Sequence, residues 1–545
     1  MNTHSTLFTG GFVIDGLGNA PVRGDVLVIG DRIAGIFRGV RRPAADRVIP
    51  IDGLAIAPGF IDMHTHSDLQ VLVNPDHTSK LSQGVTTEVL GQDGLSYAPI
   101  DAATLRELRS QLKGWNDDPP DFNWNWRTVA EYLSRLDGNV AVNCAYLVPH
   151  GNLRMLVMGN APRLATPAEL DQMKALLRRA LEEGGIGLST GLTYVPAMYA
   201  DTEELVELCS VVAEYGGFYC PHHRNYGADA IGGYAECFEI SRRSGVALHL
   251  AHTHLSYEAN RGRLPELLKM FDDAIADGVD LTFDAYPYLA GMSTLISQLP
   301  SWALAGSGDD QMARLRDPQT RKRIIDALDV TGSDGHQGLT VTWSNVYLAS
   351  VPGAPELEWT MEGNLAEAAR KLNTSPAELA LDVLIATDRG ASFVLFVGIE
   401  EHVRTLMQRE EHTVGSDGIL VGDRPHPRSW GTFPRMLETY VREEKILTLE
   451  ECVRHMTSSA ANRLRLMDRG RIAAGAYADL VVFDPKTVKA NATYENPRQA
   501  ATGIVHVIVN GVFAVEHNRV TGQRNGHALR LRTEGSDSSR TATPS

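Results

Sequence analysis

The sequence predicts an α/β protein with a smaller β-rich domain to which both chain ends contribute. Over residues 57–464, apolar runs typical of buried strands alternate with amphipathic helical segments. Residues 1–56 and 465–533 instead contain short β-rich runs separated by glycine-containing turns. Alternating strands and helices are the pattern of a parallel sheet covered by helices. We therefore expect a parallel α/β core between two halves of one small β domain.

The β-rich ends contain recognisable strands. Residues 7–14 and 478–485 are dominated by β-branched, aromatic and other apolar residues. Residues 504–515 match a hairpin around Asn510-Gly511, a dipeptide typical of a type I′ turn. The last residues, 534–545, are rich in Ser and Thr, so we expect a disordered tail there.

The middle of the chain carries two clear helix starts. Residues 166–169 are Thr, Pro, Ala and Glu, which supply an N-cap, a proline at the first helical position and a capping carboxylate. A pair of glycines ends this helix, and residues 186–190 then suit a buried strand. A second helix is predicted from Thr448 to Leu464. Residues near 295–340 fit the alternation poorly, and we expect an insertion there that sets specificity or acts as a lid.

Composition and charge exclude several classes of function. The 545 residues are 43% apolar and 22% charged, which is typical of a globular protein. The 51 basic and 67 acidic residues give a net charge of −16, which opposes binding to nucleic acid or to an anionic membrane. No apolar run is long enough for a membrane span, and the N-terminus lacks the pattern of a secretory signal. The five cysteines form no CxxC pair, so we expect reduced thiols and a cytoplasmic location, with the oligomeric state open.

Residues that commonly bind metal ions stand at the ends of several predicted strands. They are His64, His66, Asp93, His222, His252 and Asp417. Asp93 follows His64 by 29 residues and His252 follows His222 by 30, close to the roughly 31 residues of one strand–helix unit in a barrel. Because such units place their strand ends on one rim, we expect these side chains to converge. Imidazole and carboxylate groups suit Zn²⁺, with Mn, Fe or Co as alternatives, although each residue alone fits a buried histidine or a turn aspartate.

Seven motifs are spread over nearly the whole chain. They are APGFIDMHTH at 57–66, GLSTGLTY at 187–194, DAYPY at 284–288, GSDG at 415–418, PHPR at 425–428, GTFPR at 431–435 and ADLVVF at 478–483. Together they resemble the N-acyl-D-amino-acid deacylases, or D-aminoacylases, of the amidohydrolase superfamily. The resemblance implies a (β/α)₈-like TIM barrel with a small β-sandwich formed by both chain ends. It also implies a metal-dependent hydrolase that cleaves the C–N amide bond of an N-acyl-D-amino acid, a bond other than a peptide bond.

The resemblance assigns the reacting groups. His64 and His66 form one part of the metal site, and His222 and His252 form the other. Asp417 is the general base that takes a proton from water and then delivers it to the leaving nitrogen.

The resemblance also assigns three contacts to a small-molecule amide substrate. Arg428 holds a substrate carboxylate, and Tyr286 belongs to the same carboxylate pocket. Tyr194 stands where a tyrosine hydroxyl can donate to the scissile carbonyl oxygen. For the two tyrosines, a packed ring with a satisfied hydroxyl explains the sequence equally well.

Two positions depart from the family pattern. Asp93 replaces a cysteine that ligates metal, and we expect its two oxygens to bridge two sites, so that one or two Zn²⁺ ions bind per chain. His254 replaces a lysine of the carboxylate pocket, which leaves open the hydrolysis of a cyclic amide, an imide or a dipeptide on the same site. A deaminase is disfavoured because the motifs follow the deacylases. An inactive structural relative is disfavoured because every ligand position holds a competent residue.

Overall fold

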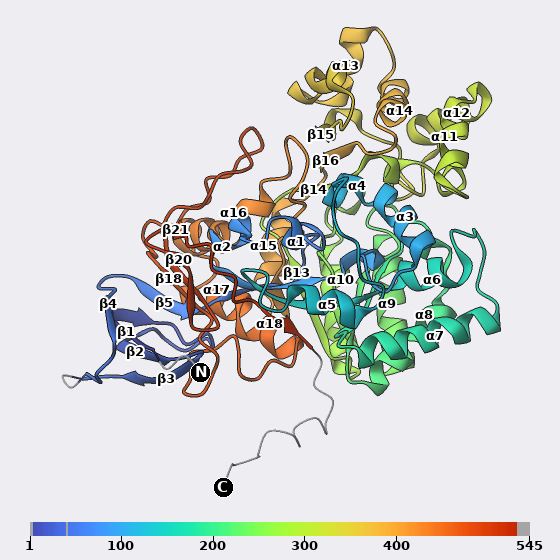
Figure 1. Ribbon diagram of the computed structural model, residues 1–545. Coiled ribbons are helices and arrows are strands. Elements are labelled where there is room, and N and C mark those ends of the chain that lie inside the picture. The colour runs from blue at the N-terminus through green and yellow to red at the C-terminus, as the bar shows by residue number, and fades with distance from the viewer. Residues whose placement is uncertain (1–3, 40–41, 531–545) are drawn as a thin grey trace.

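The computed structural model of the protein describes residues 4–39 and 42–530 and has an α/β fold (Figure 1). The tail expected at 534–545 lies outside these residues. In the part of the chain that is described, no helix is long and apolar enough to cross a membrane.

Both ends of the chain build one nine-stranded sheet. Its strands are β1 (Ser5–Val13), β2 (Val22–Ile29), β3 (Arg32–Phe37), β4 (Arg47–Pro50), β5 (Ala55–Pro58), β18 (Leu480–Phe483), β19 (Ile504–Val509), β20 (Val512–Glu516) and β21 (Arg519–Val520). β18 joins the two halves, because it pairs antiparallel with β5 and with β19. The predicted hairpin is present as β19 and β20, and both Asn510 and Gly511 have the positive φ that a type I′ turn requires.

Two further sheets are parallel throughout. The first contains β6 (Phe60–Asp62), β7 (Val85–Leu90), β8 (Asn143–Tyr146) and β22 (Ala528–Leu529), and the second contains β9 (Val148–Pro149), β10 (Gly187–Gly191), β11 (Phe218–His222), β12 (Ala247–Leu250), β13 (Leu281–Ala285) and β17 (His412–Val414). Only Leu147 separates β8 from β9. Beside β6, the Met63 amide donates to the Val414 carbonyl of β17 at 3.1 Å. The expected β-rich segment 465–533 includes β22, which instead pairs with β8 and so belongs to a parallel sheet.

Helices follow most of the parallel strands. They are α1 (Gln70–Val73), α2 (Thr78–Leu81), α3 (Ala102–Gln111), α4 (Lys113–Asn116), α5 (Val129–Leu136), α6 (His150–Met158), α7 (Pro167–Glu182), α8 (Thr202–Glu214), α9 (Ala230–Ser244), α10 (Leu264–Ala276), α15 (Glu400–Met407), α16 (Arg428–Arg435), α17 (Leu449–Met456) and α18 (Ser458–Arg463). α7 begins as predicted, because the Glu169 amide donates to Thr166 Oγ1 at 3.3 Å and the Thr166 amide donates to Glu169 Oε2 at 2.8 Å. The helix predicted from Thr448 to Leu464 is wrong as one piece, since the backbone of Thr457 (φ −136°, ψ −85°) divides it into α17 and α18.

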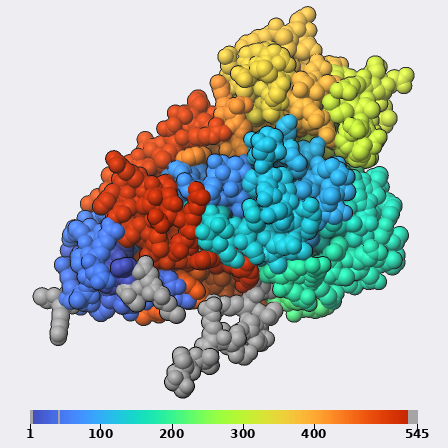
Figure 2. Space-filling model, in the orientation of Figure 1, coloured from blue at the N-terminus to red at the C-terminus, as the bar shows by residue number. Residues whose placement is uncertain are grey.

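Residues 290–396 interrupt the alternation with a small unit of their own. It has an antiparallel sheet of β14 (Ala290–Thr294), β15 (Val346–Ser350) and β16 (Ser392–Phe396), and the helices α11 (Gly308–Arg316), α12 (Pro318–Asp326), α13 (Leu365–Leu372) and α14 (Pro376–Ala386). This unit protrudes from one end of the molecule (Figure 2). The insertion expected near 295–340 is therefore longer and covers 290–396. It ends at β16 because β14 pairs with this strand, and no local pattern in the sequence connects the two.

The largest hydrophobic core lies between the parallel strands and the helices that pack on them. Val85, Leu188, Leu248 and Phe283 come from four different strands, and each is fully buried in this core. Burying one such side chain contributes about 1.5–3 kcal/mol. The core therefore holds the strands, and with them the loops that follow, in fixed positions.

Candidate metal centre and active site

Six polar side chains meet where strands of the parallel sheets end. His64 and His66 follow β6, Asp93 follows β7, His222 ends β11, His252 follows β12 and Asp417 follows β17. All six are buried, and none is more than 8% exposed. The structure therefore brings together every residue for which the sequence indicated a place in a metal site.

The Asp93 carboxylate lies at the middle of this cluster. Its Oδ2 is 3.1 Å from His222 Nδ1 and 3.6 Å from His66 Nε2. Its Oδ1 is 3.5 Å from His64 Nε2 and 3.5 Å from His252 Nε2. Four imidazoles thus surround one carboxylate, and each oxygen faces two of them.

The backbone at three of these positions is unusual. Asp93, His252 and Asp417 have φ values of 54°, 28° and 48°, in a region that non-glycine residues rarely occupy. Such conformations cost on the order of 1–3 kcal/mol each and persist only where the surroundings hold them. The Asp417 amide donates to the carbonyl of His64 at 2.8 Å, and the His252 amide donates to Asp284 Oδ1 at 3.0 Å. His64 and Asp284 therefore hold the backbone at Asp417 and His252 in place.

The electrostatics of the cluster favour a bound cation. Burial lowers the pKa of His64, but the carboxylates of Asp284, Asp93 and Asp417 outweigh burial and raise it to about 9. Burial raises the pKa of Asp93, but His222 and His252 hold it well below its usual value. The carboxylates are therefore charged at neutral pH, and the site attracts positive charge.

Two groups of side chains could hold metal ions, and both include His64. One is His64, Asp93 and His252, and the other is His64, His66 and Asp417, with ligand atoms within 4.8 Å of one another in each group. Within the described residues, both ring nitrogens of His64 and Oδ1 of Asp93 are buried without a hydrogen-bond partner. Unpaired buried polar atoms are costly, so their presence fits a site built for an ion. Imidazole nitrogens and carboxylate oxygens are the donors that Zn²⁺ takes in proteins.

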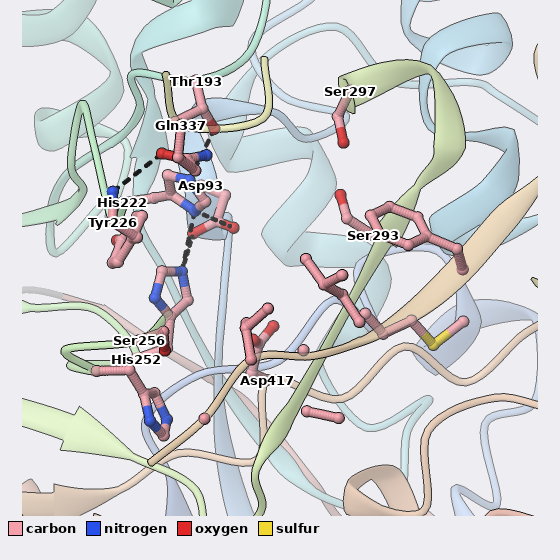
Figure 3. Close-up of a pocket in the computed structure, with 18 of the residues that line it drawn as sticks. Asp93, Thr193, His222, Tyr226, His252, Ser256, Ser293, Ser297, Gln337 and Asp417 are labelled. Atoms are coloured by element: carbon pink, nitrogen blue, oxygen red, sulfur yellow. Dashed lines mark hydrogen bonds and ion pairs between the residues drawn. The ribbon is translucent and has the colours of Figure 1, made fainter. Parts of the chain in front are cut away.

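A cavity of about 890 Å³, counting the space open to solvent, lies over this cluster. Asp93, His222 and His252 line one side of it (Figure 3). Ser293 of β14 and Ser297, which follows β14, lie on the opposite side. The inserted unit therefore supplies one wall of the cavity, and the loops after the parallel strands supply the other.

Comparisons with known proteins identify the family of this chain. A model of the amidohydrolase family matches residues 47–515. The chain belongs to the amidohydrolase family. A D-aminoacylase from Alcaligenes xylosoxydans xylosoxydans is 36% identical, and the match covers 96% of this chain and 97% of the relative. An N-acyl-D-glutamate deacylase from the same organism is 37% identical, and the match covers 96% of this chain and 95% of the relative. The crystal structure of an N-acyl-D-glutamate deacylase from Bordetella bronchiseptica, complexed with zinc and a phosphonate mimic of the tetrahedral intermediate, gives a TM-score of 0.82 at 32% identity, over 96% of this chain and 99% of that one.

In this amidohydrolase, Arg428 contacts the predicted general base directly. Arg428 is fully buried, and its Nη1 lies 2.8 Å from Asp417 Oδ2. Its guanidinium carbon lies 4.5 Å from the centre of the Tyr286 ring. Burial raises the pKa of Asp417, but Arg428 and the nearby histidines outweigh it and hold the pKa well below its usual value. Asp417 is therefore ionised at neutral pH, and the cation expected to hold a substrate carboxylate is already paired with it.

The other predicted substrate contacts line the cavity of this amidohydrolase. Tyr194 Oη is 3.3 Å from Ser293 Oγ, and burial raises the pKa of Tyr194, which keeps its hydroxyl a donor. The rings of His254 and Tyr286 lie 4.4 Å apart between centroids. Burial, with help from His252 and Arg428, lowers the pKa of His254 to about 3. His254 is therefore neutral and does not supply the positive charge of a lysine.

Two polar residues next to the cluster were not predicted. Asp284, on β13, lies with its Oδ2 3.5 Å from His64 Nδ1 and 3.2 Å from His249 Nε2. Its place at the end of an apolar run was a signal that could have revealed it, because the same pattern marks the other ligands. Lys80 lies on α2 and donates from Nζ to Asp62 Oδ2 at 2.5 Å. Nothing in the sequence around Lys80 distinguishes it from an ordinary surface lysine.

Proposed function

We propose that this protein is a metal-dependent hydrolase that removes the acyl group from small N-acyl-D-amino acids. The observation that carries the proposal is the Asp93 carboxylate surrounded by four imidazoles at the ends of parallel strands. It occurs in a chain that is 36% identical to a D-aminoacylase over nearly the full length of both proteins. In the reaction, water adds to the acyl carbon, the C–N bond breaks, and the amine leaves with a proton.

The proposed cofactor is Zn²⁺, with one or two ions per chain. Its ligands are His64, His66, Asp93, His222 and His252. The nitrogens of His64 and Oδ1 of Asp93, which are buried without a hydrogen bond, support this assignment, as does the zinc in the related deacylase. When bound, such an ion activates water and polarises a carbonyl group.

The remaining roles fall to side chains around the cavity. Asp417 accepts the proton of the attacking water and delivers it to the leaving nitrogen. Tyr194 donates a hydrogen bond to the oxyanion that develops on the carbonyl oxygen, an interaction commonly worth about 3–4 kcal/mol. Arg428, with Tyr286 and His254 beside it, orients the substrate carboxylate, which must compete with Asp417 for the guanidinium group.

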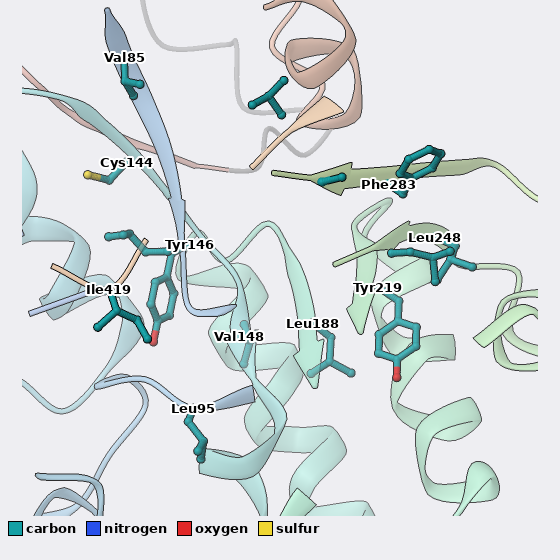
Figure 4. Close-up of a cluster of buried hydrophobic side chains, with 14 of the residues drawn as sticks. Val85, Leu95, Cys144, Tyr146, Val148, Leu188, Tyr219, Leu248, Phe283 and Ile419 are labelled. Atoms are coloured by element: carbon teal, nitrogen blue, oxygen red, sulfur yellow. The ribbon is translucent and has the colours of Figure 1, made fainter. Parts of the chain in front are cut away.

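We also propose that the two parallel sheets form one (β/α)₈-like TIM barrel. Two observations support closure of the barrel. The Met63 amide, beside β6, donates to the Val414 carbonyl of β17, and only Leu147 separates β8 from β9. Ile61, Val89 and Phe218 come from both sheets and share one buried cluster, as residues inside a barrel would. Leu188 and Leu248, on two other strands, belong instead to the core between the strands and the helices (Figure 4). Strands of a barrel have side chains of both kinds, because successive residues face opposite sides. The nine-stranded sheet then corresponds to the β-sandwich domain expected from 1–56 and 465–533, apart from β22, beside a catalytic domain of 57–464.

A screen for released amine tests the proposed function. The zinc-loaded full-length chain is offered N-acyl-D-amino acids, the matching N-acyl-L-amino acids and cyclic amides, with Asp417→Asn as the inactive control. We expect hydrolysis of the D series and a loss of about 10²–10⁴-fold in kcat in the control, because general acid–base help is removed. Turnover confined to cyclic amides, or an Asp417→Asn protein as active as the wild type, contradicts the proposal.

A further inference from the structure

The wall that the inserted unit presents to the cavity is uncharged. Met292 and Ser293 of β14 line it, together with Phe393 and Leu395 of β16. Ser297 continues the same wall (Figure 3). Of the described residues that line the cavity, none is a lysine or an arginine. A substrate in the cavity therefore meets apolar groups, hydroxyls and amides on this side.

Arg428 and Arg389, two arginines close to the cavity, already have partners. Arg428 pairs with Asp417 at 2.8 Å. Arg389 lines a smaller pocket that shares Trp115, Tyr194 and Ser297 with the cavity, but its two terminal nitrogens donate to Gln311 Oε1 at 3.1 Å and to Ser110 Oγ at 2.7 Å. Under the proposed function Arg428 binds the substrate's own α-carboxylate. Arg435 lies behind the lining Tyr288, with its guanidinium carbon 4.9 Å from the centre of that ring, and donates from Nε to the Pro287 carbonyl at 2.7 Å. Among the described residues, the lining itself therefore supplies no arginine for another anion.

A second carboxylate on the substrate would be poorly placed here. The cavity already contains the carboxylates of Asp93 and Asp417, both largely removed from water. Under the proposed function the metal is occupied by its ligands and by the scissile amide, so a further anion would lose hydration on entering the cavity and would gain no cation from the wall of the inserted unit. Such uncompensated burial of charge is strongly unfavourable. A neutral side chain, in contrast, would bury apolar surface against Met292, Phe393 and Leu395.

We infer that this protein selects N-acyl-D-amino acids with a neutral, apolar or aromatic side chain and rejects those with an acidic one. This inference rests on the proposed function and narrows it to one substrate class. Sequence similarity does not make the choice, because the chain is 36% identical to a D-aminoacylase and 37% identical to an N-acyl-D-glutamate deacylase. The absence of charged side chains from the cavity wall makes this choice.

The direct test compares four substrates on the zinc-loaded wild-type chain. They are the N-acetyl derivatives of D-leucine, D-phenylalanine, D-glutamate and D-aspartate. We expect kcat/KM to be on the order of 100-fold higher for the two neutral substrates, and a ratio below 10 overturns the inference. If the acidic substrates are hydrolysed faster, the proposed function stands and only the inference fails. If none of the four is hydrolysed, the proposed function fails and the inference fails with it.

A charge variant tests the cause of the preference. Ser297→Arg adds a cation to the uncharged wall at a residue whose hydroxyl bonds only locally, to the Thr294 carbonyl at 2.8 Å. Ser297→Gln is the matched control, because it adds bulk and polarity without charge. We expect the neutral-to-acidic ratio of kcat/KM to fall at least tenfold in Ser297→Arg and to stay at the wild-type value in Ser297→Gln. Equal ratios in the two folded variants would show that missing positive charge is not the cause.

A binding measurement covers the case in which Ser297→Arg does not fold. Calorimetry on the zinc-loaded wild type compares the affinities of the free products D-leucine and D-glutamate. We expect D-leucine to bind at least tenfold more tightly. Equal or tighter binding of D-glutamate contradicts the inference without reference to any variant.

Discussion

Charges held close together and away from water dominate the site at the scale of single residues. Asp93 contacts four imidazoles, and Asp417 contacts Arg428, while all of these side chains are buried. Because water does not screen them, the loss of one partner leaves another charge uncompensated. Single substitutions here should therefore have large and specific effects.

Asp93 should control metal content. Asp93→Ala removes the only carboxylate that faces all four imidazoles within the described site, so we expect most of the zinc and the activity to be lost together. Asp93→Cys should keep at least one Zn²⁺, because a thiolate is a good zinc ligand. Elemental analysis of both variants gives the metal per chain, with the exposed Asp171→Ala as control. Normal metal content in Asp93→Ala would mean that Asp93 only shapes the turn before Gly94.

Arg428 should matter most for substrates that carry a carboxylate. In Arg428→Ala the substrate anion loses its charge-assisted partner, and we expect kcat/KM to fall by the equivalent of about 2–5 kcal/mol. For an amide without a carboxylate, kcat/KM should fall less. This smaller fall reflects the lost pairing between Arg428 and Asp417. Steady-state kinetics on the two substrates measure the difference. Equal losses would make Arg428 a structural partner of Asp417 only.

At the scale of elements, the site depends on the loops that follow β6 and β17. Lys80 of α2 connects them, because its Nζ donates to Asp62 of β6 and, at 2.8 Å, to Ser416 Oγ next to Asp417. Asp62 in turn accepts from the Ser416 amide at 2.7 Å. Lys80 and Asp62 are both fully buried. This ion pair therefore fixes the position of the general base relative to the histidines after β6.

Breaking this ion pair should destabilise the protein. In Lys80→Met the buried charge of Asp62 loses its partner, and we expect a loss of about 3–5 kcal/mol, measured from the urea dependence of unfolding. Adding Asp62→Asn should recover part of the loss, because the unpaired charge is then absent. The exposed Lys486→Met is the control and should change stability by less than about 0.5 kcal/mol. A Lys80→Met protein as stable as this control would contradict the assignment.

At the scale of the whole molecule, the proposed metal should link stability to pH. Burial lowers the pKa of His64, but Asp284 and the other nearby carboxylates outweigh burial and raise the pKa to about 9, above its ordinary value of 6.5. The stability that protonated His64 contributes is therefore fully present below pH 6.5 and is lost as pH rises through 9. Zinc requires the neutral imidazole, so protons compete with the ion over the same range.

Zinc should therefore stabilise the protein more at high pH. We expect the increase in Tm on adding zinc to the chelator-stripped protein to grow between pH 6.5 and 9. Thermal unfolding with and without zinc at several pH values measures it. His64→Asn should remove most of the pH dependence while the protein stays folded. A zinc-induced shift that is constant across this range would show that His64 does not exchange a proton for the metal.

The sequence by itself determined the parts of this protein that repeat or that depend on neighbouring residues. The alternation of strands and helices, the start of α7 and the turn at Asn510 and Gly511 follow from local propensity and capping. The near-constant spacing between His64 and Asp93, and between His222 and His252, placed these side chains at corresponding strand ends. Their meeting around one point could therefore be predicted without coordinates.

Only the tertiary structure decided the contacts between residues that are distant in the chain. The pairing of Arg428 with Asp417, the bond from Lys80 to Asp62 and the extent of the inserted unit have no local signal. The same holds for the charge of the cavity wall, since β14 and β16 meet only after the intervening residues have folded. Local patterns report energies between neighbours, whereas these contacts arise from packing that brings separate segments together. For that reason the class of reaction is visible in the sequence, and the features that select the substrate become visible in the fold.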